Sequence, residues 1–586
     1  MMKAKPIILA AALLFGVSAF AQHNEEVTIE GTYRPKVNKV DKILIQPETP
    51  KLSFEMPGTE IHVKDIEHRF PLELEKLTPL GYNGKNGQTP EPAKNFLMAG
   101  MGTRISPVFL YKHHSNLTKN LGLGIGIKHS SSWLDIKDYA PSSFMNNAFS
   151  IGLYSSKYKN LQLGGDVYYK YDMYHYYGVD LTETPLTEAQ MEKYCPRQDY
   201  NTIGGHLGLA SAATRVGEWS HSGDLDLHYT FDNTFARELF GGLEYGLAYT
   251  QNWWGSKSHP QRIGMNLAFQ YEYFDTSHYN GFDPVMGRDD LYLMKLNPFF
   301  ETGDEFFKLH LGVRLDGVNR IQLQKDKFLA VYPDVSGSLY VLNKKLEFYA
   351  GLNGGRKLCT YSEIIEENPF AGCEYSLLAQ NVKLGFDGGV RTNIAEVVDL
   401  HIGVRYRHTD NDPLFVGDYL KSAIPQPSSG FVYNAFRPVY DETQRVSVVA
   451  DMRLKLRNGF TGDLGFAYNH YDLATYQYAW HRPTMEGRAH FAYHVNGKLS
   501  VNASFLYQGG RYGAFSANNY SGYVMQVFGA RKLEDVFDLG VGADYRINDQ
   551  LSVFAKLNNV LNQNYQLYCD YPVGGIQFFA GMKMTF

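Results

Sequence analysis

The sequence predicts an all-β protein, a transmembrane antiparallel β-barrel of about 22 strands. Three observations support this prediction: an N-terminal export signal, apolar residues that alternate with polar residues or glycine over nearly 500 residues, and a terminal aromatic residue, Phe586, at the end of an alternating strand. A soluble β-sandwich also alternates, so one such strand decides nothing. The repetition together with the signal favours a multi-pass barrel in the outer membrane of a Gram-negative bacterium.

Composition excludes several other classes of protein. The 586 residues include 56 Lys+Arg and 61 Asp+Glu, and 14 % of them are aromatic, with 43 Tyr. This nearly neutral balance argues against a nucleic-acid partner, which attracts clustered basic residues. A mean hydropathy of −0.32 and the lack of an internal apolar run of 18 residues argue against a helical membrane protein. The hydrophobic content of 44 % argues against a disordered chain.

The first 21 residues read as a secretory signal peptide. Lys3 and Lys5 precede an apolar stretch at 7–17, and Ala19 and Ala21 form a small-x-small cleavage site. The apolar stretch is too short to span a bilayer, so we expect it to be removed on export.

Residues 22–93 differ from the rest of the chain. They contain 8 of the 24 prolines, 12 acidic and 9 basic residues, and show no sustained periodicity. Dense proline blocks both helix interiors and sheet ladders. We therefore expect an extended N-terminal segment that lies in the periplasm or inserts into the barrel lumen.

Residues 94–586 are predicted to form the barrel. In 121–127 and 576–586, apolar residues alternate with Gly, Lys or Gln, so one face meets lipid and the other meets a wet lumen. Ten short inner turns enclose nine pairs of strands, which makes 18. Two strands precede the first turn and two follow the last, so the total is 22. These turns are expected near 113–118, 156–160, 214–221, 252–261, 301–305, 342–345, 391–397, 456–459, 494–498 and 546–550. The longer outer loops are expected at 178–199, 277–288, 358–379, 409–442, 512–529 and 559–572.

Tyrosine is dense just before the first long loop, in 168–177. An interfacial girdle explains this density, because a ring with one polar end is stable between lipid and water. A stacking platform for a sugar or an aromatic ligand is the alternative.

Charged residues within strands are expected to point inward, because a lipid-facing Arg or Lys costs about 2–4 kcal/mol at midplane. One interpretation is that these charged residues form a solvated wall of mutually paired charges. The other is that they form a lining that selects solutes or binds the N-terminal segment. The predicted lumen-lining residues are Lys383, Asp387, Arg405, Asp463, Asp544, Lys556 and Lys583.

The sequence shows no catalytic, cofactor or zinc motif, and we predict neither an enzyme nor a cofactor. His113 and His114 are expected at a surface turn rather than in a metal site. Cys359 and Cys373 bracket a short polar segment and could form a disulfide. Nothing local indicates whether Cys195 and Cys569 meet.

The C-terminus resembles that of the TonB-dependent outer-membrane receptors. Asn559, Asn562 and Tyr565 match the Asn-x-x-Asn-x-x-Tyr pattern of that family, which also ends in a phenylalanine like Phe586. The resemblance implies a barrel inserted by the outer-membrane assembly machinery through its C-terminal strand, with outer-membrane lipid around it. The segment Glu26-Val27-Thr28-Ile29 resembles a TonB box, so TonB or another periplasmic or outer-membrane protein is an implied partner.

The family carries a plug of well over a hundred residues, whereas 22–93 supplies 72. The segment that begins at Thr32 is similar to the N-termini of plugless receptor-like barrels from Bacteroidota. Two functions therefore remain open. The barrel passes or takes up a solute across the outer membrane, or it is a scaffold subunit of an outer-membrane complex whose N-terminal segment binds a periplasmic partner.

Overall fold

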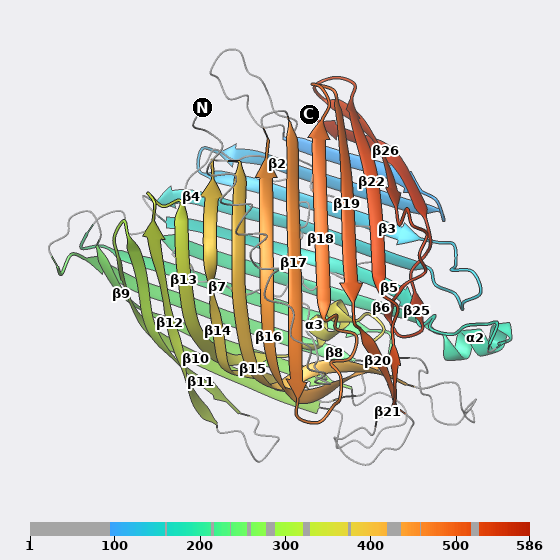
Figure 1. The fold of residues 1–586 in the computed structure, drawn as a ribbon, viewed down its shortest axis with the longest axis horizontal. Coiled ribbons are helices and arrows are strands. Elements are labelled where there is room, and N and C mark those ends of the chain that lie inside the picture. Colours follow the sequence, from blue (N-terminus) through green and yellow to red (C-terminus); the bar gives the residue numbers. More distant parts are fainter. Residues whose placement is uncertain are drawn as a thin grey trace, which may run out of the picture.

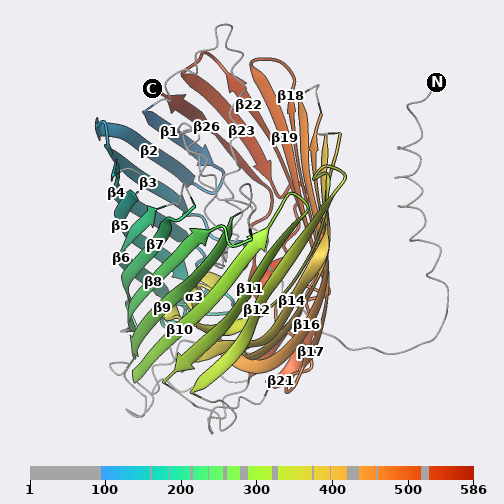
Figure 2. The ribbon, with the colours of Figure 1, turned by 90° about the vertical axis from the view of Figure 1, so that its left-hand side faces the viewer.

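The structure, a computed structural model, describes residues 94–158, 161–183, 185–211, 216–234, 236–254, 260–276, 288–319, 328–372, 375, 377–395, 397–418, 435–456, 459–516 and 527–586. Within these residues, 24 strands share one sheet. Twenty-two of them close into an antiparallel barrel, and the other two, β20 and β21, form a hairpin attached in parallel to the end of β15. Figure 1 and Figure 2 show the closed wall from two sides. The predicted barrel and its strand number are confirmed.

The barrel strands follow one another around the wall in chain order, and β1 pairs with β26 to close it. Their bounds are β1 Asn95–Gly102, β2 Ser106–Thr118, β3 Leu121–Ser132, β4 Phe144–Tyr158, β5 Leu161–His175, β6 Arg197–Ser211, β7 Trp219–Asp232, β8 Arg237–Gln251, β9 Gln261–Asp275, β10 Arg288–Gly303, β11 Phe307–Val318, β12 Leu329–Val341, β13 Leu346–Leu358, β14 Ala379–Ile394, β15 Val398–Asp418, β16 Phe436–Lys455, β17 Phe460–Leu473, β18 Met485–His494, β19 Leu499–Gly509, β22 Val536–Arg546, β23 Leu551–Asn558 and β26 Gln577–Thr585. The remaining elements are α2 Glu188–Tyr194, α3 Tyr361–Glu367, β20 Tyr512–Ser516, β21 Val527–Lys532, β24 Gln566–Tyr568 and β25 Tyr571–Pro572.

The outer face of the wall is apolar. Val331 on β12 is 64 % exposed, Leu207 on β6 is 61 % exposed, and Val167 on β5 is 58 % exposed. Because side chains alternate along a strand, the residues between them face the lumen. This is the lipid belt of an outer-membrane barrel.

The two ends of the barrel meet at its periplasmic edge. Asn95 and Phe586 exchange backbone hydrogen bonds at 2.8 and 3.0 Å, so the first strand begins at the level where the last strand ends. The ten short connections, from 119–120 to 547–550, lie at the same edge. Most connections at the opposite edge are longer, although 103–105 and 233–236 are short, so that edge is extracellular.

Several predicted boundaries are wrong, and the predicted loop 512–529 contains β20 and the start of β21. The first inner turn lies at 119–120 rather than near 113–118, because β2 continues to Thr118. The predicted loop 409–442 is shorter, since β15 extends to Asp418 and β16 begins at Phe436. The polar stretch that suggested a loop instead contains a β-bulge, where the buried Asp412 forms an ion pair with Arg482 at 2.9 Å.

None of the helices in the described part of the chain is long and apolar enough to cross a membrane. In both views α3 lies within the outline of the barrel, whereas α2 lies at the extracellular edge in Figure 1.

Candidate functional site

Most of the extracellular loops meet in a large apolar core, which we call the extracellular core, and two smaller apolar clusters lie at the same end. The extracellular core is built from strand ends and from loop residues that are far apart in sequence. Its larger buried members are Phe144, Tyr174, Tyr176, Tyr177, Tyr194, Tyr200, Phe274, Tyr361, Phe370, Phe415, Phe436 and Tyr571. Buried side chains from both walls and from several loops therefore pack together at this end of the barrel.

The centre of the extracellular core is residues 359–372, which we call the α3 segment. Thr360 is the N-cap of α3, and its hydroxyl accepts a hydrogen bond from the Glu363 amide at 3.2 Å. Tyr361, Ile364 and Ile365 form the buried face of the helix. A short amphipathic helix thus turns its apolar side toward the barrel wall.

Carboxylates from the wall hold the first turn of α3. The Tyr361 amide donates to Glu272 on β9 at 3.2 Å, and the Ser362 amide donates to Glu238 on β8 at 3.1 Å. The Tyr361 hydroxyl donates to Asp232 on β7 at 2.7 Å. Helix N-termini carry unpaired N–H groups and a partial positive charge, so buried carboxylates are suitable partners.

Aromatic packing holds the other end of the α3 segment. The Phe370 ring stacks on Tyr571 with centroids 3.9 Å apart. The Tyr200 hydroxyl donates to the Pro369 carbonyl at 3.0 Å, and the Tyr568 hydroxyl donates to the Glu367 carbonyl. The α3 segment therefore connects β6 to the C-terminal loop 559–576 across the lumen.

Below the extracellular core, one side of the lumen wall is basic. On β14 and β15, Asp387 accepts from Arg407 at 2.5 Å and lies 3.6 Å from Arg405. On β16 and β18, Asp451 pairs with Arg488 at 2.9 Å. Cations exceed carboxylates on this face of β14 to β18, whose inward arginines are Arg391, Arg405, Arg407, Arg445, Arg453 and Arg488.

The facing side of the wall is acidic. Strand register places Asp166, His206 and Asp226 in one row across β5, β6 and β7. Asp224 and Glu244 are directly paired on β7 and β8. Because β5–β8 and β14–β18 are about half a circumference apart in the strand order, the lumen has opposite charge on its two sides.

The structure places most of the predicted lumen residues on inward positions. Lys583 forms an ion pair with Asp544, and Asp463 pairs with Arg453 at 2.7 Å. Alternation also places Asp387, Arg405 and Lys556 on the inner face.

Lys383 requires a correction. Its ammonium group lies 2.7 Å from Asp410 and 3.0 Å from Glu442, on the outer side of the wall. The cause is a β-bulge between Val382 and Leu384, which reverses the alternation that sequence reasoning assumed.

His113 and His114 are also corrected, because both lie within β2 and not at a turn. They point to opposite faces. His113 contacts Asn95 at 2.8 Å, whereas His114 stacks on Tyr154 with centroids 5.3 Å apart. The Tyr154 ring lies where a side chain at residue 122 would be, which explains the glycine there.

Some tyrosines of β5 and the following loop lie on the outer face of the wall, and others are buried in the extracellular core. Tyr169 is 41 % exposed on the outer face, as the girdle interpretation predicts. Tyr174, Tyr176 and Tyr177 are instead buried in the extracellular core, which neither interpretation foresaw.

The C-terminal motif has a structural role. Asn559 and Asn562 adopt left-handed backbone conformations, with φ of 48° and 53°, which asparagine tolerates. The Asn562 side chain accepts from the Ile576 amide at 2.8 Å, and the Tyr565 hydroxyl donates to Asp538 at 2.8 Å. The motif thus shapes the last outer loop, while Phe586 closes the barrel.

Four predicted features lie outside the described residues: the signal peptide 1–21, the N-terminal segment 22–93, the TonB-box-like stretch within it at Glu26, Val27, Thr28 and Ile29, and Cys373. The Cys359–Cys373 disulfide is therefore untested. Cys359 itself is buried.

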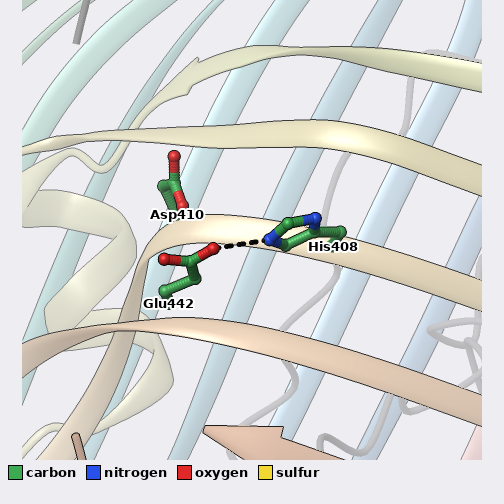
Figure 3. Close-up of side chains that lie close together, drawn as sticks. All are labelled: His408, Asp410 and Glu442. Carbon is green, nitrogen blue, oxygen red and sulfur yellow. Dashed lines mark hydrogen bonds and ion pairs between the residues drawn. The ribbon is translucent and has the colours of Figure 1, made fainter. Parts of the chain in front are cut away.

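Sequence reasoning missed the cluster of His408, Asp410 and Glu442, shown in Figure 3. His408 and Asp410 are two residues apart, which places them on one face of a strand. That spacing was a usable signal, whereas Glu442 joins them only through strand pairing.

Comparison with protein-family models and with curated proteins found no match. Solved structures do match the fold. The siderophore receptor PirA from Acinetobacter baumannii has a TM-score of 0.60 at 11 % identity, over 84 % of this chain and 80 % of that one. The ferric-catecholate import receptor Fiu from E. coli K12 has a TM-score of 0.59 at 9 % identity, over 85 % and 82 %. The FrpB iron transporter from Neisseria meningitidis has a TM-score of 0.58 at 10 % identity, over 84 % and 82 %.

These identities show a shared fold. The chain is a multi-pass outer-membrane β-barrel similar in architecture to receptors for siderophores and metals. The solved structures are named as receptors and transporters, not as enzymes.

Proposed function

We propose that this protein carries a polar solute across the outer membrane through a lumen that the α3 segment gates at its extracellular end. The observation that carries the proposal is how that segment is held. Its first two backbone amides donate hydrogen bonds to the wall carboxylates Glu272 and Glu238, and Phe370 stacks on Tyr571, so the segment is fixed across the lumen. Contacts of this kind can be exchanged without breaking a barrel strand.

The lumen chemistry supports a polar cargo. An acidic row on β5–β8 faces an arginine-rich wall on β14–β18. Side chains of both signs favour hydrated, charged or zwitterionic solutes over lipids. The likeness to siderophore and metal receptors supports uptake as the general role, and the particular solute stays open.

The N-terminal segment completes the proposal. An open barrel of 22 strands has a wide lumen and would breach the membrane barrier. We place residues 22–93 at the periplasmic mouth or in the lumen, since β1 begins at the periplasmic edge. In this proposal Glu26–Ile29 adds a strand to TonB, as the resemblance implies.

One observation favours the alternative, a scaffold subunit. Tyr361 is 0 % exposed and Phe370 is 3 % exposed, which is burial typical of a permanent core. A scaffold would keep this end closed and use residues 22–93 to bind a periplasmic partner.

Planar-bilayer conductance separates the two functions. We would compare the full chain with three variants: one without residues 22–93, one with 361–371 replaced by a Gly-Ser linker of equal length, and one with both changes. Transport predicts large steps when the block is removed, and above all in the double variant. The matched control replaces 188–193 of α2 by the same kind of linker and should remain silent.

Silence in all of these proteins would reject the gated channel. Recovery of a stoichiometric partner from native membranes, lost when 22–93 is deleted, would then establish the scaffold.

A further inference from the structure

A polar cluster lies on the outer face of the wall, just beyond the apolar belt. On β15, Ile402 and Val404 are 48 % and 42 % exposed, so even-numbered residues face outward up to His408. On β16 the same applies to Val446 and Val448, which places Glu442 outward. The cluster therefore lies at the extracellular boundary of the lipid belt and is reachable from water.

Three ligand atoms converge in this cluster. One ring nitrogen of His408 and one carboxylate oxygen each of Asp410 and Glu442 lie within 4.8 Å of one another. Figure 3 shows the His408 ring directed at the Glu442 carboxylate, and Nε2 lies 2.7 Å from its oxygen. The Lys383 ammonium lies 2.7 Å from Asp410 and 3.0 Å from Glu442.

Two β-bulges lie beside this cluster. The pairing of β14 with β15 shifts between Val382 and Leu384, and the pairing of β15 with β16 shifts between Thr409 and Asp412. Bulges redirect side chains and are common beside functional sites. The bulge on β14 brings Lys383 to the outer face, where alternation along β15 already places His408 and Asp410.

The donor set matches a particular class of cation. One imidazole nitrogen and two carboxylate oxygens are ligands that zinc accepts, with water filling the fourth position. Two carboxylates carry two negative charges, and the single ammonium of Lys383 neutralises one of them. A divalent cation would neutralise both and would also use the His408 nitrogen.

We propose that His408, Asp410 and Glu442 form a binding site for a divalent cation of the zinc class, with Lys383 as the resident cation that the metal displaces. Binding requires the Lys383 ammonium to swing away from the Asp410 and Glu442 carboxylates. The metal would then join β15 to β16 where these strands extend beyond the membrane. This proposal is independent of the gated-channel proposal.

Isothermal titration of the refolded full chain in detergent with Zn²⁺ tests the proposal. His408→Ala and Glu442→Gln should each weaken Zn²⁺ binding at this site at least tenfold, because each removes one ligand. Lys383→Met should strengthen it at least tenfold, because it removes the competing cation and keeps the length of the side chain. The opposite directions of these effects distinguish a metal site from general damage to the fold.

His129→Ala is the matched control. His129 also lies on the outer face near the extracellular edge, but its ring contacts Asn147 at 2.8 Å and Ser131 at 3.1 Å. Its loss should leave the titration unchanged, and all variants should keep the heat-dependent gel shift of a folded barrel. Equal Zn²⁺ affinity in the full chain and in His408→Ala would overturn the proposal, as would a Lys383→Met variant that binds no tighter. Either result would leave the cluster an ordinary ion-pair network.

Discussion

His481, in the outer loop 474–484, shows how one residue joins separate loops. Its Nδ1–H donates to the Phe415 carbonyl, and its Nε2 accepts from the Cys569 amide, both at 3.2 Å. Only a neutral ring makes both bonds. Burial, reinforced by the positive charges of Arg511 and Arg531, lowers the pKa of His481 to about 3. The residue therefore stabilises the loop assembly in its neutral form.

This pKa predicts acid sensitivity of the extracellular core. When the loops open, the pKa of His481 returns to its ordinary value of 6.5, so the open state binds the extra proton. Its contribution is complete above pH 6.5 and is lost as the pH falls toward 3. Linkage gives a loss of about 3 kcal/mol between pH 7 and pH 4. Amide hydrogen exchange of residues 474–484 should accelerate accordingly.

His481→Gln is the informative variant for this test. Glutamine offers a donor and an acceptor but does not titrate, so its loop should lose much less protection on acidification. A variant that follows the same pH curve as the original chain would show that another group is responsible.

At the scale of an element, α3 depends on the wall for its position. A helix of seven residues is too short to be stable alone in water. Its position comes from Glu238 and Glu272, which replace the missing partners of its first amides, and from the buried side chains of one face. The position of α3 therefore depends on these two wall residues and on its buried face.

Glu238→Gln should loosen this helix without opening a cavity, because it keeps the side-chain volume but removes the charge. Hydrogen bonds to charged groups are stronger than neutral ones, and we expect a loss of about 1–2 kcal/mol. Amide exchange of residues 361–367 should become about 5–30 times faster. Glu244→Gln, on the same strand and face but in the acidic row, is the control. Equal protection in both variants would contradict the anchoring role.

At the scale of the whole molecule, the barrel depends on the seam between β1 and β26. Gly100 and Gly581 are directly opposite each other in this seam. A Cβ at residue 581 would overlap the Ala99 carbonyl oxygen and the Gly100 Cα. The seam thus requires glycine so that the first and last strands can approach.

Gly581→Val should therefore impair closure. Overpacking at such a site costs about 1–3 kcal/mol or more. The fraction of refolded protein that shows the heat-dependent gel shift should fall. Gly124→Val is the matched control, because a Cβ at that lumen position meets nothing within 4 Å. Equal refolding yields would show that the seam tolerates the extra volume.

Much of this architecture could be predicted from local pattern. Alternation along 121–127 and 576–586 fixed which faces meet lipid, and polar turns marked the ten inner connections. The candidate sites were harder to predict from the sequence. The long β15–β16 extension, the outward Lys383 and the buried Tyr174 each depend on bulges or on loops packed from distant parts of the chain.

The all-β class, the strand number and the sidedness of the barrel follow from local pattern, because period-two alternation and turn chemistry are properties of neighbouring residues. Folding in three dimensions is what brings the α3 segment across the lumen, gives the two sides of the lumen opposite charge, and makes His408, Asp410 and Glu442 meet. Those features depend on strand register and on contacts between residues tens to hundreds of positions apart. Local pattern carries no information about which distant residues will pair.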